Sequence, residues 1–346
     1  MSKHPEHFRF VEYLIFAAVT LAVMCLCICA GSVDIPLRDT VTVIFNAVAG
    51  KAQQDSVKSA ILLVRRLPRV LCVALSGMAL SLSGAAMQGL LKNPLADGST
   101  LGVSSGASLG AVLAIALGIT FPSLPFAGTM VMAILFAFLS LMIILALAYK
   151  LDYSLSTNTI ILIGVIYSMF VSAAMNVIIT FSAEKVKDIT FWTMGSLQNA
   201  SYKNAAILAA VLAVCGGILF CHGNELNAFA VGEDNARHIG VNVRRVKLVV
   251  LINVSVLIGV CVSIGGTISF VGLVTPHMVR MIVGPNHKRL LPASAFGGAV
   301  FLLSADLIAR ILLKPLELPI GVITSLVGAV AFIFIFYQTG KRGTKC

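Results

Sequence analysis

The chain has 346 residues, of which 58% are hydrophobic and only 11% charged, and its formal net charge is +11. A soluble domain carries roughly 25% charged residues, so this composition cannot cover a globular surface with polar groups and excludes a water-soluble protein. No basic block interleaved with aromatic residues is present, which argues against binding to nucleic acid. We therefore expect an all-α polytopic membrane protein with lipid around most of its surface.

Apolar stretches of spanning length predict about ten transmembrane helices in one domain that covers residues 1–346. In chain order, the expected spans are 10–32, 61–91, 99–117, 125–149, 156–181, 203–221, 248–264, 267–283, 291–312 and 321–338. The first apolar run exceeds the length of a signal-peptide core, so it is interpreted as a retained helix.

Two polar segments are not expected to span. Residues 182–203 contain the only tryptophan, Trp192, which is typical of a short helix at the membrane surface. Residues 222–247 are interrupted by Gly232 and Gly240, so they predict two short polar helices.

The basic residues indicate the orientation. An even number of spans puts both termini on one side, and placing them inside leaves 14 of the 25 Lys and Arg residues inside and 11 outside. Four of the outer residues, Arg65, Arg66, Arg69 and Arg310, lie at helix ends. Without these four the pattern is clearly positive-inside. We predict cytoplasmic termini, a cytoplasmic 222–247, an extracytoplasmic 182–203 and a basic cluster on the outer face.

Residues 84–111 are dense in glycine and serine, which has two interpretations. The first is close helix packing. The second is that Asn93 and Pro94 interrupt the span and let it flex during transport. Asp97 is expected to cap the helix that follows.

Pro276 marks a second expected point of flexing, next to His277 in an apolar span. A histidine there can be a proton relay or a metal ligand, but no second ligand stands at helical spacing, which favours a hydrogen-bonded packing role. The eight cysteines include no CxxC pair, so no metal or redox site is expected.

Asp306 and Arg310 stand four residues apart on one predicted helix, so they can form an ion pair. Spacing alone leaves two roles equally open, a structural pair and an arginine exposed on an outer docking surface.

The nucleotide-binding motif GxxxxGK[ST] is absent from the sequence. No Ser/His/Asp spacing, HExxH motif or pair of intramembrane carboxylates is found either. We therefore expect no enzymatic activity and no resident cofactor.

Several stretches together resemble one family, the FecCD-type permeases, which are the membrane-spanning subunits of ABC importers for iron-siderophores, haem and vitamin B12. The resemblance covers nearly the whole chain and rests on RRLPRVL, GAAMQGLLKNPLADGSTLGVSSGASLGA, FWTMGSL, AVGEDNARHIGVNVRR, ISFVGLVTPHMVRMIVGPNHKRLLPAS, ADLIAR and ELPIGVITSLVGA. Each stretch alone is weak evidence, whereas their common order and spacing are strong evidence.

The resemblance implies a type II ABC importer permease of ten spans, paired as a homodimer with the transport path on its two-fold axis. It also implies two cytoplasmic ATPase subunits and an extracytoplasmic substrate-binding protein. By motif, Arg66, Arg69 and Arg310 match the arginines that receive the binding protein. Residues 228–247 match the segment that contacts the ATPase, which assigns coupling roles to Gly232, Glu233, Asp234, Arg237, Gly240 and Arg244.

The expected function is thus ATP-driven import of an iron chelate across a bacterial cytoplasmic membrane. A ferric siderophore is the expected cargo because it is the commonest class, and haem and cobalamin stay open. An ion-coupled secondary transporter with a broken-helix site is the alternative. A membrane scaffold protein is the third option, but it gives no reason for an outer basic cluster.

Overall fold

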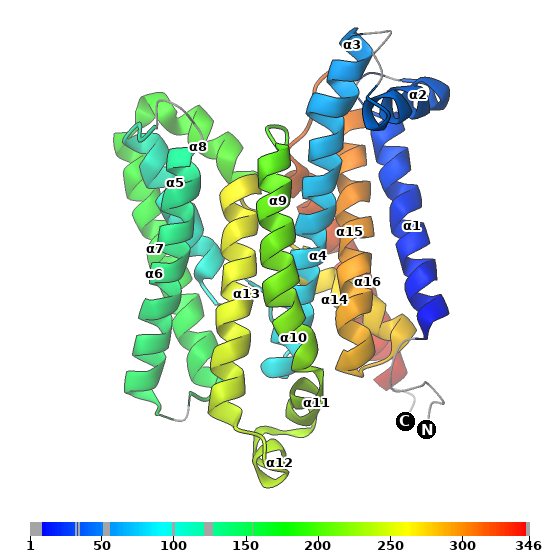
Figure 1. Cartoon of the computed structure of the whole chain (residues 1–346). Coiled ribbons are helices and arrows are strands. Elements are labelled where there is room, and N and C mark those ends of the chain that lie inside the picture. Colours follow the sequence, from blue (N-terminus) through cyan, green and yellow to red (C-terminus); the bar gives the residue numbers. More distant parts are fainter. Residues whose placement is uncertain are drawn as a thin grey trace.

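The computed structural model describes residues 9–31, 33, 35–50, 56–98, 101–120, 127–153 and 155–343. Within these ranges the chain is helical and holds no β-strand, only an isolated bridge between Leu313 and Leu316. The all-α prediction is confirmed (Figure 1).

The helices follow one another along the whole chain. They are α1 (Phe10–Cys29), α2 (Leu37–Val48), α3 (Ser56–Ser59), the π-helical turn η1 (Ala60–Arg66), α4 (Leu67–Leu90), α5 (Val103–Ala116), α6 (Ala127–Leu151), α7 (Thr157–Phe181), the 3₁₀ turn η2 (Ala183–Lys185), α8 (Val186–Thr193), α9 (Tyr202–Val211), the π-helical turn η3 (Leu212–Gly216), α10 (Gly217–Cys221), α11 (Gly223–Val231), α12 (Glu233–His238), α13 (Val243–Gly265), α14 (Val271–Val283), α15 (His287–Ile311) and α16 (Ile320–Gly343).

The described helices match the predicted spans. Seven are long and apolar enough to cross a membrane, and three shorter apolar stretches lie at Val103–Ala116, Val271–Val283 and Ile320–Phe334. Each of the ten predicted ranges overlaps one of these segments. The predicted spans 99–117 and 267–283 are too long, however, because α5 begins only at Val103 and α14 only at Val271.

The two polar segments lie at opposite ends of the molecule. The polar arm, defined as α11 and α12 (Gly223–His238), lies at the end where α1 begins and α16 ends, whereas α8 lies at the other end, as α2 and α3 do (Figure 1). We call these the arm end and the opposite end. Gly232, with φ of 150°, separates the two helices of the arm, and Gly240, with φ of 89°, follows them. The two predicted short helices are thus confirmed.

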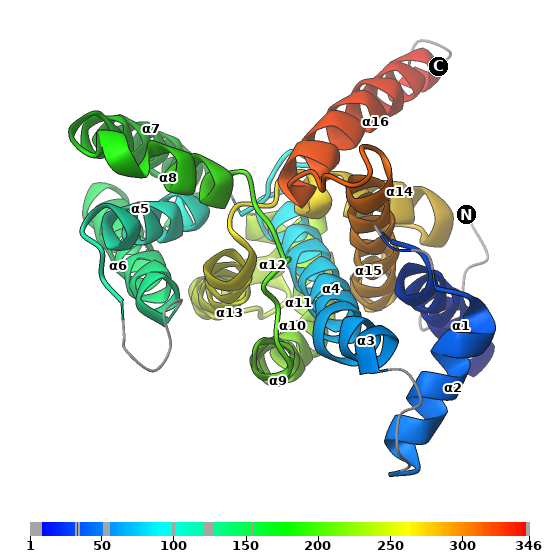
Figure 2. The ribbon, with the colours of Figure 1, turned by 90° about the horizontal axis from the view of Figure 1, so that it is seen from above.

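The core of the molecule is α4, which lies between α13, α14 and α15 (Figure 2). Glycines bring these helices into backbone contact: a Cβ atom on Gly77 would overlap the carbonyl of Gly298, and one on Gly84 would overlap that of Gly272. Close approach of this kind is how helices associate in lipid, where side-chain burial gains little. The packing interpretation of the glycine-rich segment is therefore confirmed at Gly84.

Helices α7 and α16 diverge on either side of this core when the molecule is seen from above (Figure 2). Both carry large exposed apolar side chains, among them Met169 and Phe170 on α7 and Val330 and Ile333 on α16. These surfaces need lipid or protein to cover them.

Candidate functional site

A pocket lies where α5 and α14 begin. At 14 and 13 residues, these helices are only about 20 Å long, less than the hydrocarbon thickness of about 30 Å. Their non-helical approaches therefore lie at membrane depth, where such backbone is tolerated only inside protein or along a cavity. The central pocket, of about 310 Å³, is that cavity.

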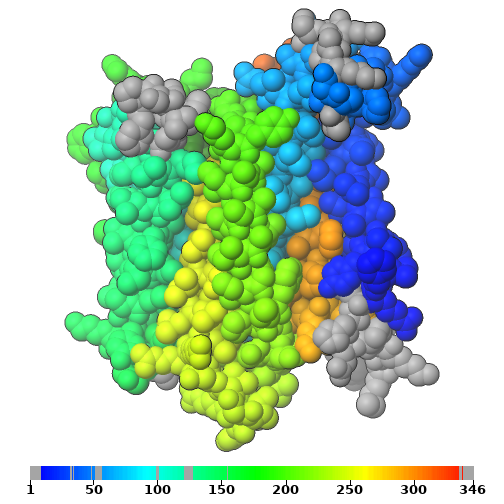
Figure 3. Space-filling view, in the orientation of Figure 1, coloured from blue at the N-terminus to red at the C-terminus, as the bar shows by residue number. Residues whose placement is uncertain are grey.

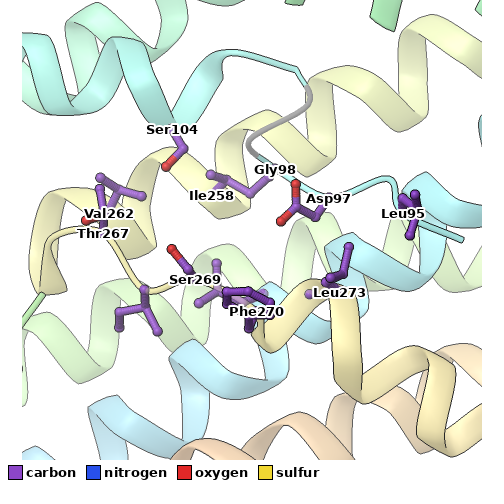
Figure 4. Close-up of a pocket in the computed structure, with 13 residues that line it drawn as sticks. Leu95, Asp97, Gly98, Ser104, Ile258, Val262, Thr267, Ser269, Phe270 and Leu273 are labelled. Carbon is purple, nitrogen blue, oxygen red and sulfur yellow. The ribbon is translucent and has the colours of Figure 1, made fainter. Parts of the chain in front are cut away.

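The central pocket has a mixed lining. Its polar side chains are Asp97, Ser104, Thr267 and Ser269, and Figure 4 shows the oxygens of Asp97, Ser104 and Ser269 directed into the same space. The remaining lining residues are apolar or glycine and come from α4, α13, α14 and the segments that precede α5 and α14. One carboxylate among hydroxyl groups can hold a polar molecule or a cation in transit.

Asn93 and Pro94 explain why α4 stops at the pocket. The Asn93 side-chain oxygen accepts a hydrogen bond from the Leu95 N–H at 2.9 Å, which closes a local turn, and Pro94 follows without an N–H to donate. The described residues that follow, 91–98, are non-helical, and α5 begins at Val103. Asp97 is not the predicted helix cap, because Gly102, with φ of 69°, holds that position and Asp97 lines the pocket instead.

Pro276 lies inside α14, which continues past it to Val283. The neighbouring His277 is half-buried, and its Nδ1 makes no hydrogen bond within the described residues, so the hydrogen-bonded packing role is not found. No group of three or more His, Cys, Asp or Glu residues placed to hold a metal occurs among them either.

The last turn of α4 connects the pocket to the polar arm. Gln88 is buried, donates to the carbonyls of Gly272 and Leu273 at 3.3 and 3.1 Å, and accepts from Arg280 at 3.1 Å. Just beyond the helix, Lys92 donates to the carbonyl of Val231 at 3.4 Å. One helix end therefore contacts both the start of α14 and the end of α11.

The base of α12 is fixed by a buried ion pair. The fully buried Lys247 ammonium lies 2.7 Å from Glu233 and donates to the Leu155 carbonyl at 2.8 Å. Thr157 donates to the same Glu233 oxygen at 2.8 Å. Glu233, assigned to coupling by the resemblance, thus joins α12 to α7 and α13.

We define the knob as Asp234–Ile239, which is most of α12 and the residue that follows it. Asp234 and Arg237 are exposed and 4.0 Å apart, and Ile239 is 71% exposed although it is apolar. Beside the knob, the exposed Arg244 lies over the rings of Tyr149 and Tyr153 at 4.9 and 5.0 Å. Hydrogen bonds from Tyr149 and Arg244 lower the pKa of Tyr153 below its ordinary value.

A second attachment joins the arm to α15. The Asn227 side-chain oxygen accepts from the His287 backbone N–H at 2.7 Å and lies 2.9 Å from its Nδ1, while the Asn227 amide donates to Asn286 at 2.9 Å. Sequence reasoning missed Asn227, Asn286 and Lys247. Asn227 pairs with Asn286 and His287, 59 and 60 residues away, and Lys247 pairs with Glu233, 14 residues away, so these contacts lie beyond any local pattern.

The predicted basic cluster lies at the opposite end of the molecule, and its arginines are turned inward. Arg69 lies 2.8 Å from Asp306 and 2.6 Å from Glu317, and Arg310 lies 2.9 Å from the other oxygen of Asp306. Asp306 is fully buried, and Arg69 and Arg310 are 8% and 2% exposed. Of the two roles that the sequence left open for Asp306 and Arg310, the structure shows the structural ion pair.

Arg66 is also buried and donates to the carbonyls of Ile28, Cys29 and Val33 at the end of α1. Of the four arginines that disturb the charge balance, only Arg65 is exposed. The expectation that Arg66, Arg69 and Arg310 face outward is therefore corrected, because intramolecular acceptors hold their guanidinium groups. A docking role for this end of the molecule stays a prediction.

Comparison with known proteins agrees with this architecture. The sequence model of the FecCD transport family matches residues 19–338. The chain is 39% identical to an uncharacterised ABC transporter permease protein, YvrB of Bacillus subtilis, over 97% of this chain and 96% of that one. It is 36% identical to the cobalamin import system permease protein BtuC of Halobacterium salinarum, over 80% of this chain and 73% of that one. Among solved structures, a metal-chelate type ABC transporter in an inward-facing conformation superposes with a TM-score of 0.83 at 30% identity, covering 94% of this chain and 99% of that one.

The substitution Asp306→Asn tests the charge cluster. It leaves Arg310 buried without a carboxylate, and breaking such a pair costs about 3–5 kcal/mol, so the thermal unfolding midpoint in detergent should fall on the order of 5–10 °C. Asp188→Asn, at an exposed position of α8, is the matched control and should leave the midpoint unchanged. Equal midpoints for the two variants would contradict a stabilising role for the cluster.

Proposed function

The chain belongs to the FecCD transport family, a family of ABC importer permeases, and we propose that it forms the membrane path for an iron chelate, driven by separate ATPase subunits. The observation that carries this proposal is that the last turn of α4 contacts both the central pocket and the polar arm. The hydrogen bonds of Gln88 to α14 and of Lys92 to α11 provide that link. A displacement of the arm would therefore be transmitted to the pocket through these hydrogen bonds.

Energy enters at the knob in this proposal. The chain has no nucleotide-binding motif of its own, so ATP must act from another subunit. Exposed Ile239 and the charged Asp234 and Arg237 offer a small mixed surface of the kind that a protein partner covers. Gly232 and Gly240 set the backbone on either side of α12, and Arg244 flanks it.

Two attachments carry the motion onward. Glu233 joins the arm to α13 through Lys247, and Asn227 joins it to the start of α15. When the ATPases close, the arm displaces these helices, and the segment from Asn93 to Asp97 and the proline of α14, Pro276, flex to open the pocket to one side. This gives alternating access.

A second copy of the chain completes the path. Helices α7 and α16 expose apolar side chains on either side of the core (Figure 2), and pairing through these surfaces would enclose a passage between the two copies. The assembly lies in the bacterial cytoplasmic membrane, with the arm end and both termini in the cytoplasm, as the distribution of Lys and Arg favours.

An extracytoplasmic substrate-binding protein docks at the opposite end. The exposed Arg65 supplies a direct contact, and the buried Arg66, Arg69 and Arg310 hold α1, α4 and α15 in the arrangement that presents it. The three buried arginines outnumber the carboxylates of Asp306 and Glu317 by one, so this cluster carries an excess positive charge, which favours an acidic partner.

One observation favours the alternative of an ion-coupled secondary transporter, namely the carboxylate of Asp97 in the central pocket. Ionisable groups in mid-span are the usual coupling sites of that class. It leaves the exposed knob without a role, however, so we prefer the importer.

A ferric siderophore is the proposed cargo. The central pocket has both hydroxyl and apolar walls, which suits a chelate with a polar rim and an organic shell. Ligand binding by the cognate extracytoplasmic protein selects among the candidates. Binding of a ferric siderophore supports the proposal, whereas binding of haem or cobalamin would overturn the cargo and leave the permease role intact.

The substitution Ile239→Glu tests the knob. It places a charge at the centre of the proposed contact, and loss of a central apolar residue typically weakens an interface on the order of tenfold or more. Co-purification of the ATPase with the permease in mild detergent should fall accordingly. The control Lys203→Glu alters an exposed residue at the start of α9, at the opposite end, and should retain the ATPase. Full retention by Ile239→Glu would remove the case for the knob.

A further inference from the structure

A lateral groove of about 520 Å³ opens on the outside of the helix bundle, between α1, α10 and α15. Figure 3 shows α15, in orange, at the floor between α9 and α10, in green, and α1, in blue. The groove lies on the near face of Figure 1, whereas α7 and α16 lie behind the core. It is therefore separate from both the central pocket and the proposed contact between copies.

The groove has the dimensions of a lipid chain. Along α15 it extends from Lys288 to Phe296, eight residues or about 12 Å, which is close to the half-thickness of about 15 Å of a bilayer's hydrocarbon core. Met78, Leu212 and Leu291 are among its lining residues. These side chains present only apolar atoms, so this part of the groove suits an acyl chain and not a polar solute.

The polar residues of the groove lie together at the arm end. They are Tyr13 near the start of α1 and His287 and Lys288 at the start of α15. The His287 Nδ1 is held by Asn227, and its buried ring faces Gly89, so the histidine is directed into the bundle. Lys288 is therefore the cationic side chain that lines the groove at the arm end.

The charge of Lys288 is uncompensated within the described part of the chain, since its ammonium makes no ion pair or hydrogen bond there. The adjacent Arg289 differs, because Glu12 neutralises it at 2.8 Å. The Lys288 stem runs beside Gly223, the first residue of α11. A cation at the end of an apolar groove between membrane helices is the arrangement that binds the headgroups of anionic lipids.

We propose that the lateral groove binds one anionic phospholipid. One acyl chain lies along α15 between α1 and α10, and the phosphate lies on the Lys288 ammonium beside the start of the polar arm. The binding requires only that the helices lie in a membrane, so it holds whatever the cargo.

Fluorescence quenching tests the proposal on the full chain in vesicles. Trp192 is the only tryptophan, so the double substitution Trp192→Phe and Phe220→Trp moves the reporter to the wall of the groove, where Phe220 is 43% exposed. The probes are brominated phosphatidylglycerol and brominated phosphatidylcholine, each titrated into unbrominated phosphatidylcholine. We expect the anionic lipid to associate about fivefold more strongly, as one lysine near a membrane surface provides.

Two variants in the reporter background separate a specific site from general attraction to a basic protein. Lys288→Gln should abolish the preference for phosphatidylglycerol and leave quenching by phosphatidylcholine unchanged. Lys203→Gln, which removes an equal charge from the opposite end, should keep the full preference. Equal quenching by the two lipids in the unmodified reporter, or a preference that survives Lys288→Gln, would overturn the proposal.

Discussion

The buried carboxylate of Asp306, shared by Arg69 and Arg310, is the constraint on which the arrangement of this protein depends. An uncompensated charge in this environment would be costly, so the two arginines and the aspartate must stay together, and they hold α4 against α15 at the opposite end of the molecule. Below them, Gly77 and Gly298 bring the two backbones into contact. At the arm end, Asn227 joins α15 to the polar arm. The closely packed pair α4–α15 thus extends between the two ends of the molecule.

The features proposed to move are built around this pair. Helix α4 stops at Leu90, and the chain that follows borders the central pocket before α5 begins at Val103. On the other side of the pocket, α14 starts late and contains Pro276. In the proposed mechanism, the closely packed pair keeps its arrangement and deformation is confined to the segments beside the pocket, as alternating access driven from outside the membrane requires.

Much of this fold follows from the sequence, because hydropathy and glycine act locally. The ten apolar segments, the two helices of the arm and the close packing at Gly84 could all be predicted that way. The sequence could not predict which way the charged side chains point or which partners they pair with. Arg66 and Arg310 were expected outside because orientation rules count cations without their partners, and the partners of Arg66 are backbone carbonyls of α1. The role of Asp97 was predicted wrongly and that of Lys247 was not predicted. In both cases the residues that surround the side chain come from distant parts of the chain.

The source of energy for transport tests the central claim most directly. The measurement is uptake of a radiolabelled ferric siderophore into proteoliposomes that contain the permease, its ATPase and its binding protein. The account predicts accumulation only when MgATP is supplied to the ATPase side, unaffected by ionophores that collapse proton and sodium gradients. Accumulation by the permease alone, driven by such a gradient and abolished by its collapse, would contradict it.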